Sequence, residues 1–362
     1  MSSYQYIIIG GGISGLYAAY LLEQRGITDY LLIEANDVLG GRLKSMRINE
    51  EDAFDLGATW FWPNEQTQLS NVIHDFGLTT FDQYQMGEML IERSQSRLPQ
   101  RMQLHSPISK RVKGGMKALI DKVVSKLDQT HILLSHQVVE LVQEGEQTKV
   151  HVKCPNHVTK VFSSQQILVA IPPRLAVSTI QFIPELPTAF KEKWLNTATW
   201  MAPHAKYIAV YDHPFWRDQK LSGSAHSSVG PLAEIHDASS LDGSAALFGF
   251  IGLPAYARKT FTDVELSNHC RHQLIRLFGS QAATPKSEFI KDWAKDSLIA
   301  TEDDHSPTIG HPYPPTKSPD NSIWQSKIIG ISSEFSPNYS GYLAGAIEAA
   351  TLGIQTLFSK TQ

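Results

Sequence analysis

The stretch YQYIIIGGGISGLYAAYLLEQRGITDYLLIE, residues 4–34, decides the fold of this chain. Its two ends, residues 4–9 and 29–33, are nearly continuous apolar runs, which are typical of strands in a parallel sheet covered on both faces. Between them a glycine turn, residues 10–15, leads into a helix that we expect to end near Arg25. The stretch therefore predicts a strand–helix–strand unit of the dinucleotide-binding kind.

The turn carries the fingerprint Gly10-x-Gly12-x-x-Gly15, and Glu34 ends the second strand nineteen residues after Gly15. Gly10 permits the tight turn, Gly12 lets the backbone approach a pyrophosphate, and Gly15 lets the helix pack close to the strand. The helix N-terminus offers unpaired amides and a positive dipole end to the phosphates. Glu34 can bind both ribose hydroxyls. We therefore expect an adenine dinucleotide here, with FAD and NAD both open at this point.

Composition limits the class of protein. The 362 residues are 42% apolar and 19% charged, which indicates about two to three compact units. A net charge of -4 gives no basic field for nucleic acid. The two cysteines, Cys154 and Cys270, form neither a disulfide framework nor a metal-ligand spacing. No secretory signal and no apolar span are present, so we expect a cytoplasmic protein without nucleic-acid or membrane partners.

Later segments predict a second sheet. Strands are expected at residues 132–134, 138–142, 150–152 and 167–171, and Pro172-Pro173 ends the last of them. Beyond it, strands at residues 206–211, 245–252 and 289–293 surround a helix at residues 263–278. Residues 302–320 are rich in proline and polar residues and predict a loop, and a strand at 327–331 precedes a helix at 340–360.

Several motifs resemble, in order, those of the flavin monoamine oxidase family. They are Gly40-Gly41-Arg42, the segment DLGATW at residues 55–60, Gly114-Gly115-Met116, Val138, AIPP at residues 170–173, Glu334, and SGYLAGA at residues 340–346. The likeness runs from the first strand to the last helix. It implies FAD rather than NAD, with Arg42 on the pyrophosphate, the backbone at Gly57 along the flavin, and the last helix N-terminus at the pyrimidine end of the flavin ring.

The resemblance gives the residues expected at the cofactor. They are Gly10, Gly12, Ile13, Ser14, Gly15, Glu34, Ala35, Gly41, Arg42, Gly57, Ala58, Thr59, Trp60, Val138, Ala170, Trp293, Ser333, Glu334, Tyr342 and Leu343.

The resemblance also locates a reaction end. Strand alternation places Lys206 on the same face as Ile208 and Val210, so that a buried face carries its amine inward and favours the neutral form. The matching lysine of the family holds a water against flavin N5, which makes Lys206 the catalytic candidate. Trp60 and Tyr342 are the substrate candidates.

This chain departs from the family in two ways. After Trp293 it has neither the second cage tyrosine nor the cysteine that bonds the flavin, so we expect noncovalent FAD. Only about fifty residues separate the Gly57 loop from the Gly115 helix, where the family has a long helical insert. The substrate cavity is therefore expected to be shallower or more open, and a bulky amine or a completing partner both remain open.

The resemblance implies an α/β fold: a Rossmann-like FAD-binding domain with a GR2-type parallel sheet, and a second α+β substrate domain with a mixed sheet. Residues 1–60, 111–175 and 321–362 are expected in the first, and 61–110 and 176–320 in the second.

The implied reaction is oxidation of the C–N bond of a small amine or amino acid by hydride transfer to the flavin. The imine then hydrolyses, and molecular oxygen reoxidises the flavin with release of hydrogen peroxide. Two alternatives stay open: an FAD dehydrogenase or desaturase acting on a nonamine, and a noncatalytic flavin-binding partner protein. The sequence leaves the oligomeric state open.

Overall fold

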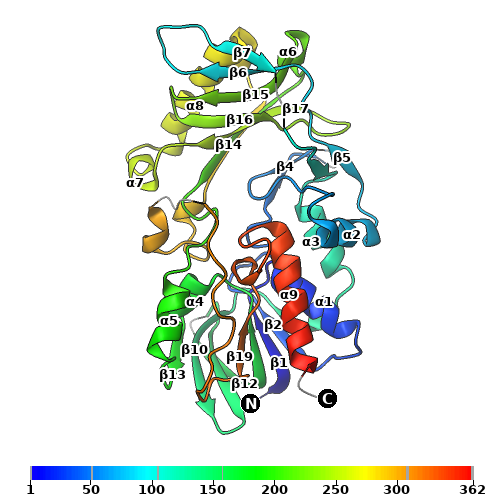
Figure 1. Cartoon of the computed structure of the whole chain (residues 1–362), viewed down its shortest axis with the longest axis vertical. Coiled ribbons are helices and arrows are strands. Elements are labelled where there is room, and N and C mark those ends of the chain that lie inside the picture. The colour runs from blue at the N-terminus through cyan, green and yellow to red at the C-terminus, as the bar shows by residue number, and fades with distance from the viewer. Residues whose placement is uncertain (1, 50–51, 104–105, 157, 307–309, 360–362) are drawn as a thin grey trace.

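Two large sheets lie at opposite ends of an elongated molecule (Figure 1). This computed structural model describes residues 2–49, 52–103, 106–156, 158–306 and 310–359. Residues 307–309 of the expected loop and Lys360, where the last helix was expected to end, lie outside the described residues.

The first sheet has the order β13-β10-β11-β12-β1-β2-β9, with β19 also paired to β12. Its strands are β1 (Ser3–Ile9), β2 (Tyr30–Ile33), β9 (Ile132–Leu133), β10 (Gln137–Glu144), β11 (Gln147–Lys153), β12 (Thr159–Val169), β13 (Gln181–Ile183) and β19 (Ile328–Gly330). The pairs β1–β2, β1–β12, β2–β9 and β12–β19 are parallel, whereas β11 is antiparallel to both β10 and β12. The predicted parallel strand–helix–strand unit is confirmed.

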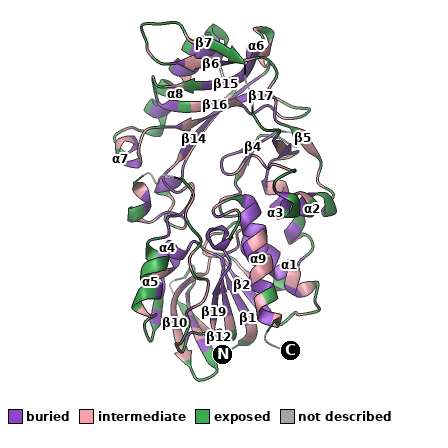
Figure 2. Ribbon diagram, in the orientation of Figure 1, coloured by how far each residue is buried: buried purple, intermediate pink, exposed green. Residues whose placement is uncertain are grey.

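Helices cover both faces of this sheet (Figure 1). On one face, α1 (Ile13–Glu23), α3 (Lys117–Val124) and α9 (Leu343–Phe358) pack against Ile8 and Leu32. On the other, α4 (Pro173–Thr179) and α5 (Thr188–Leu195) pack near Ile7 and Leu31. Side chains alternate between the faces along a strand. Two covered faces explain why β1 and β2 are apolar at successive positions, and Figure 2 shows β1 mostly buried.

The second sheet is mixed, with the order β18-β14-β17-β16-β15-β6-β7. Its strands are β6 (Glu88–Glu92), β7 (Gln100–Gln103), β14 (Ala205–Tyr211), β15 (Leu221–Ser227), β16 (Leu232–Asp237), β17 (Ala245–Ile251) and β18 (Ser287–Asp292). The β6–β15 pair is parallel and the other pairs are antiparallel. Helix α8 (Asp263–Phe278) packs on one face, and a capping box between Thr262 and Glu265 fixes its start.

The remaining elements are short. They are β3 (Ser45–Arg47), β4 (Ala53–Asp55), β5 (Thr80–Asp82), β8 (Lys110–Val112), α2 (Thr67–Asp75), α6 (Phe215–Asp218), α7 (Ala255–Arg258), and the 3-10 turns Gln129–His131, Ser280–Ala283, Trp293–Lys295, Glu302–His305 and Ser333–Phe335.

Two helix starts differ from the sequence prediction, and backbone geometry gives the reason. The helix expected from Gly114-Gly115 begins at Lys117, because both glycines have positive φ. The last helix begins at Leu343 rather than at residue 340, because Gly341 has a φ of 81° and cannot belong to a right-handed helix. The structure also makes the 302–320 segment partly helical, since residues 302–305 form a 3-10 turn.

The described residues contain no helix that combines the length and apolarity needed to cross a membrane. They also hold no group of three His, Cys, Asp or Glu side chains placed to bind a metal ion.

Candidate active site

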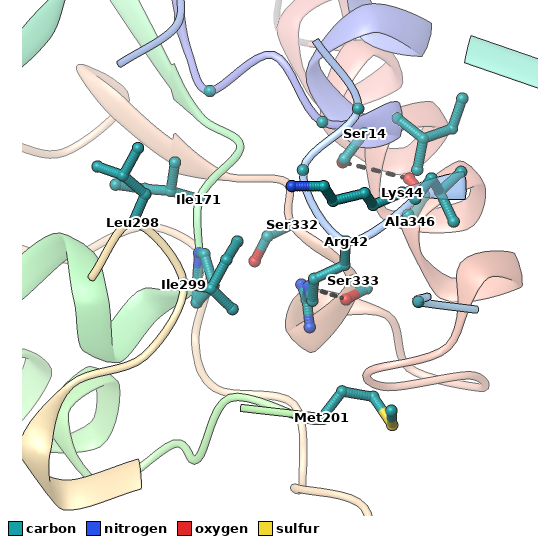
Figure 3. Close-up of a pocket in the computed structure, with 18 of the residues that line it drawn as sticks. Ser14, Arg42, Lys44, Ile171, Met201, Leu298, Ile299, Ser332, Ser333 and Ala346 are labelled. Carbon is teal, nitrogen blue, oxygen red and sulfur yellow. Dashed lines mark hydrogen bonds between the residues drawn. The ribbon is translucent and has the colours of Figure 1, made fainter. Parts of the chain in front are cut away.

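A cavity of about 670 Å³ runs from the glycine corner to the strand that carries Lys206. Its volume falls in the range of about 300–1,000 Å³ that is typical of ligand sites. The residues expected at the cofactor and at the reaction end line it, with the exception of Gly15 and Glu334. These two lie behind the cavity wall. Figure 3 shows the wall, with Ile171, Leu298 and Ile299 grouped together and Ser332 beside Arg42 and Ser333.

The glycine corner has the geometry that a dinucleotide needs. Gly10 has a φ of 108° and makes the tight turn. A Cβ on Gly15 would lie 2.0 Å from the Gly10 carbonyl oxygen, so this glycine permits close packing of the helix on the strand. A Cβ on Gly12 would meet its nearest atom only at 4.0 Å, so the space in front of Gly12 is open. No side chain caps α1, which leaves its first amides available to a phosphate.

Glu34 is tied to the same corner. Its Oε2 accepts a 2.6 Å hydrogen bond from the Gly11 amide and its Oε1 a 2.7 Å bond from the Asn36 amide. Burial raises the pKa of the Glu34 carboxyl, and these backbone amides counteract part of that effect. The carboxylate is therefore fixed at the cavity wall beside Gly12, where the adenosine ribose of a dinucleotide would lie.

Arg42 forms a bidentate ion pair with Glu334 under the cavity floor. Nη1 lies 2.6 Å from Oε1 and Nη2 lies 3.0 Å from Oε2. Nη2 also donates to Ser333 Oγ at 3.0 Å, the dashed line beside Arg42 in Figure 3. Burial alone would raise the pKa of the Glu334 carboxyl, but the Arg42 guanidinium holds it below its usual value. Glu334, expected at the cofactor, is fully buried and acts on the cavity through Arg42.

Contacts inside the protein give a reason for glycine at position 57, in addition to the expected approach of the backbone to a flavin. A Cβ there would lie 1.8 Å from the Arg42 carbonyl oxygen and 3.3 Å from the Trp293 ring. The Trp293 indole donates to the Leu56 carbonyl at 3.1 Å. Packing inside the protein therefore requires glycine at position 57, whatever the cavity holds.

Lys206 lies on the inward face of β14, as strand alternation predicts. Its side chain is 1% exposed, and Nζ lies 2.8 Å from Gly57 O, 3.0 Å from Asp55 O and 2.8 Å from Thr59 Oγ1. Nζ also lies 4.3 Å above the Phe248 ring centroid. These contacts join the two halves of the molecule at the reaction end of the cavity.

Lys206 can change charge without losing a hydrogen bond. Burial lowers the pKa of its amine to about 7. The two carbonyls accept from two N–H groups in either form. Thr59 Oγ1 accepts the third N–H of the ammonium, and its hydroxyl can donate to the lone pair of the neutral amine. All three positions of Nζ are therefore taken, so a water at Nζ would displace one of them.

The second wall of the reaction end is a histidine that the sequence prediction missed. The rings of Trp200 and His311 stack with centroids 3.7 Å apart, and His311 and Tyr342 stack at 4.0 Å. Tyr342, for which the sequence offers no second cage tyrosine, thus faces an imidazole. The position was missed because His311 lies in the proline-rich segment without periodicity. Other cavity residues absent from the prediction include Trp62, Met201, Phe250, Leu298 and Ile299.

Comparison with known proteins identifies this architecture. The family model described as flavin containing amine oxidoreductase matches residues 85–352, and a model of an NAD(P)-binding Rossmann-like domain matches residues 8–76. The first match covers most of the chain. The chain belongs to the flavin-containing amine oxidoreductase family. Its cofactor is accordingly FAD, and the open space at Gly12 and the uncapped start of α1 fit it.

Curated relatives of this amine oxidoreductase are distant. It is 24% identical to a probable flavin-containing monoamine oxidase A of Dictyostelium discoideum, over 81% of this chain and 84% of that protein. It is 26% identical to the putrescine oxidase of Kocuria rosea, over 54% of this chain and 43% of that protein.

Two solved structures share the fold of this amine oxidoreductase. Wild-type putrescine oxidase bound to putrescine matches with a TM-score of 0.80, and cyclohexylamine oxidase from Brevibacterium oxydans with a TM-score of 0.81. Each is 18% identical, and each match covers 99% of both chains. The predicted fold class is confirmed: a Rossmann-like domain with parallel strands and a second domain with a mixed sheet.

Proposed function

We propose that this oxidoreductase oxidises the C–N bond of a small amine at the end of the cavity marked by Lys206, Trp60 and Tyr342. When bound there, FAD would accept a hydride from the carbon next to the amine nitrogen, giving an imine that water hydrolyses, and oxygen would return the cofactor to its oxidised form with release of hydrogen peroxide. The observation that carries this proposal is the fully buried Lys206, whose side chain reaches from β14 to the Gly57 loop and lines the cavity.

Residues at one end of the cavity would bind the cofactor, and residues at the other end would take part in the reaction. Gly12, Ser14 and Glu34 would hold the adenosine and phosphates, with Arg42 supplying positive charge from a position fixed by Glu334. Lys206 would give up one of its three present hydrogen bonds to a water near the flavin ring and exchange a proton with that water. The low pKa of about 7 allows that exchange near neutral pH.

We further propose that the flavin is bound without a covalent link. Cys154 and Cys270 are both buried, and neither lines the cavity. Cys270 lies on the buried face of α8, where burial raises the pKa of its thiol well above the ordinary value. No thiolate is therefore available to bond the flavin ring.

We also propose a division into two domains. Residues 1–60, 111–175 and 321–362 would form the FAD-binding domain, and residues 61–110 and 176–320 the substrate domain. In support, β6 and β7 come from the first substrate segment, and β6 pairs both with β7 and with β15 of the second segment. Within residues 176–320, β13 and α5 lie against the first sheet and would therefore belong with the FAD-binding domain.

Anaerobic addition of amines to the purified yellow protein tests the function. Bleaching of the flavin, followed by recovery of colour and release of peroxide when oxygen is admitted, is the expected result. Bleaching by a nonamine alone would favour the dehydrogenase alternative, and a flavin that no substrate reduces would favour the noncatalytic one.

A further inference from the structure

The indole of Trp60, which lines the reaction end of the cavity, is held by a hydrogen bond and by two neighbouring rings. Its Nε1 donates to Gln83 Oε1 at 2.7 Å. The ring centroid lies 4.8 Å from that of His236, edge to face, and 5.3 Å from that of Phe248. Both of these rings belong to the second sheet. The second domain therefore fixes the orientation of a side chain that borders the cavity.

The Gln83 carboxamide has one orientation that satisfies its contacts. Its Nε2 donates to the Asp237 carbonyl oxygen at 2.8 Å and to the Tyr84 carbonyl oxygen at 3.3 Å. Carbonyl oxygens only accept and an indole nitrogen only donates, so the amide nitrogen must face the carbonyls and the amide oxygen must face Trp60. Gln83 is 8% exposed, so water cannot readily replace these partners.

Asp237, which accepts from Gln83 through its carbonyl, is itself firmly held. It is the last residue of β16 and is 1% exposed. Its Oδ2 accepts from Trp216 Nε1 at 2.9 Å and from Arg217 Nε and Nη2 at 3.0 and 2.8 Å. Its Oδ1 accepts from the Ser239 amide at 2.8 Å. The end of β16 thus offers Gln83 an acceptor in a fixed place.

The backbone of Gln83 is anchored as well, within the short segment that joins the Gly57 loop to the Gly115 helix. Gln83 directly follows β5, which lies between the two large sheets (Figure 1). Its amide donates to the Ser109 carbonyl at 2.9 Å. Close by, Phe61 and Lys110 exchange backbone hydrogen bonds of 3.0 and 2.8 Å. The chain next to Trp60 and the chain that carries Gln83 are therefore held in one register.

We propose that Gln83 is a positioning residue for amine oxidation, which fixes the Trp60 indole and thereby sets the shape of the reaction end. This inference rests on the proposed function and goes beyond it. Among the described residues that the Gln83 side chain binds, only Trp60 lines the cavity, so an effect of Gln83 on the substrate passes through Trp60. Lys206 is held by other groups, so the effect falls on amine binding more than on the chemical step.

A double-mutant cycle on the holoenzyme tests this role. Gln83→Met keeps the length of the side chain and removes its hydrogen bonds, and Trp60→Phe removes the indole N–H. We expect Gln83→Met to raise the amine concentration that half-saturates flavin reduction at least about tenfold, with the limiting rate changed less than about threefold. In the Trp60→Phe background the same substitution should change half-saturation less than about twofold. Equal effects in the two backgrounds, or no effect in wild type, overturn the proposal.

The matched control for this cycle is Gln85→Met. Gln85 lies two positions further along the chain, and its amide makes a single long contact of 3.5 Å with the Pro107 carbonyl. We expect Gln85→Met to leave both half-saturation and the limiting rate as in wild type. A change as large as that of Gln83→Met would show that the effect comes from the segment as a whole, and would overturn the specific role of Gln83.

Hydrogen exchange of the Trp60 indole tests the contact without turnover. Its NMR resonance is the one missing from Trp60→Phe. We expect the indole hydrogen to exchange at least about tenfold more slowly in wild-type holoenzyme than in Gln83→Met. If Gln83→Met does not fold, exchange in wild type as fast as in free indole still overturns the proposal. Failure of every amine to reduce the wild-type flavin refutes the proposed function, whereas fast exchange with turnover intact refutes the role of Gln83 alone.

Discussion

Arg42 and Glu334, which are 292 positions apart in the chain, form a bidentate ion pair beneath the cavity floor. The Glu334 side chain is fully buried, whereas the Arg42 side chain keeps 20% of its surface exposed. The pair thus fastens the last flavin segment, near α9, to the loop after β2. It also leaves one edge of the guanidinium accessible.

Removing Arg42 is expected to cost more stability than removing a surface cation. Arg42→Met leaves Glu334 buried and unpaired, which costs about 3–5 kcal/mol. Lys110→Met, which breaks an exposed pair with Asp82, is the control and should cost less than about 1 kcal/mol. Denaturant unfolding of the apoprotein measures both. Similar losses in the free energy of unfolding for the two variants would show that the buried pair stabilises the protein no more than the exposed pair does.

The same pair predicts how stability depends on pH. The pKa of Glu334 is lowered in the folded state from its ordinary value of 4.5. A depressed carboxyl pKa contributes stability that is fully present above the unfolded value and is lost as the pH falls through the folded value. The melting temperature of wild type should therefore fall below about pH 4.5 more steeply than that of Glu334→Gln. Parallel curves for the two proteins would contradict the pairing.

Lys206→Met is expected to retain FAD and to slow flavin reduction or reoxidation by about 100-fold, as removal of a preorganised polar group does elsewhere. Stopped-flow absorbance in single turnovers separates the two half-reactions. The control is Lys286→Met, which removes a half-exposed lysine next to the same sheet. Wild-type rates in both half-reactions of Lys206→Met would remove the role assigned to this lysine.

The Thr59 hydroxyl should influence the pKa of the Lys206 amine. Thr59→Val removes the hydroxyl that accepts from the ammonium, so it should move the apparent pKa near 7 in the rate profile downward, whereas Thr59→Ser should leave it in place. The profile of kcat against pH for the three proteins measures the shift. A Thr59→Val profile that superimposes on wild type would show that this titration belongs to another group.

Two glycines of the same fingerprint should respond differently to alanine. Gly12→Ala adds a methyl in open space, so the protein should fold and bind FAD more weakly. Gly15→Ala places a Cβ 2.0 Å from the Gly10 carbonyl oxygen, so it should destabilise the first domain even without FAD. Thermal unfolding of the apoprotein and FAD titration separate the two effects. Equal FAD affinity in Gly12→Ala and wild type would count against a phosphate at this turn.

The sequence predicted best those features that depend on local periodicity. The apolar runs of β1 and β2 and the helix at residues 263–278 appear as expected, because burial on both faces or on one stripe leaves a direct pattern. The inward side of Lys206 followed from strand alternation in the same way. Gly341, by contrast, delayed the start of α9 through a positive φ that no periodicity reveals.

Long-range pairings were outside what the sequence could predict. The ion pair of Arg42 with Glu334 joins segments from opposite ends of the chain. The stacking of His311 between Trp200 and Tyr342 brings together three segments, of which one was expected only as a loop. The close approach of the Arg42 carbonyl oxygen to Gly57 is a second constraint on that glycine, beside the expected approach to a flavin. Such contacts depend on tertiary packing, which propensities do not encode.

Anaerobic titration of the purified protein with a simple apolar amine is the decisive measurement of FAD-dependent amine oxidation by this chain. We expect a yellow protein that releases FAD on denaturation, loses its flavin absorbance on addition of the amine, and regains it with one peroxide formed per amine consumed when oxygen enters. A properly folded protein that neither carries nor takes up FAD would contradict this function.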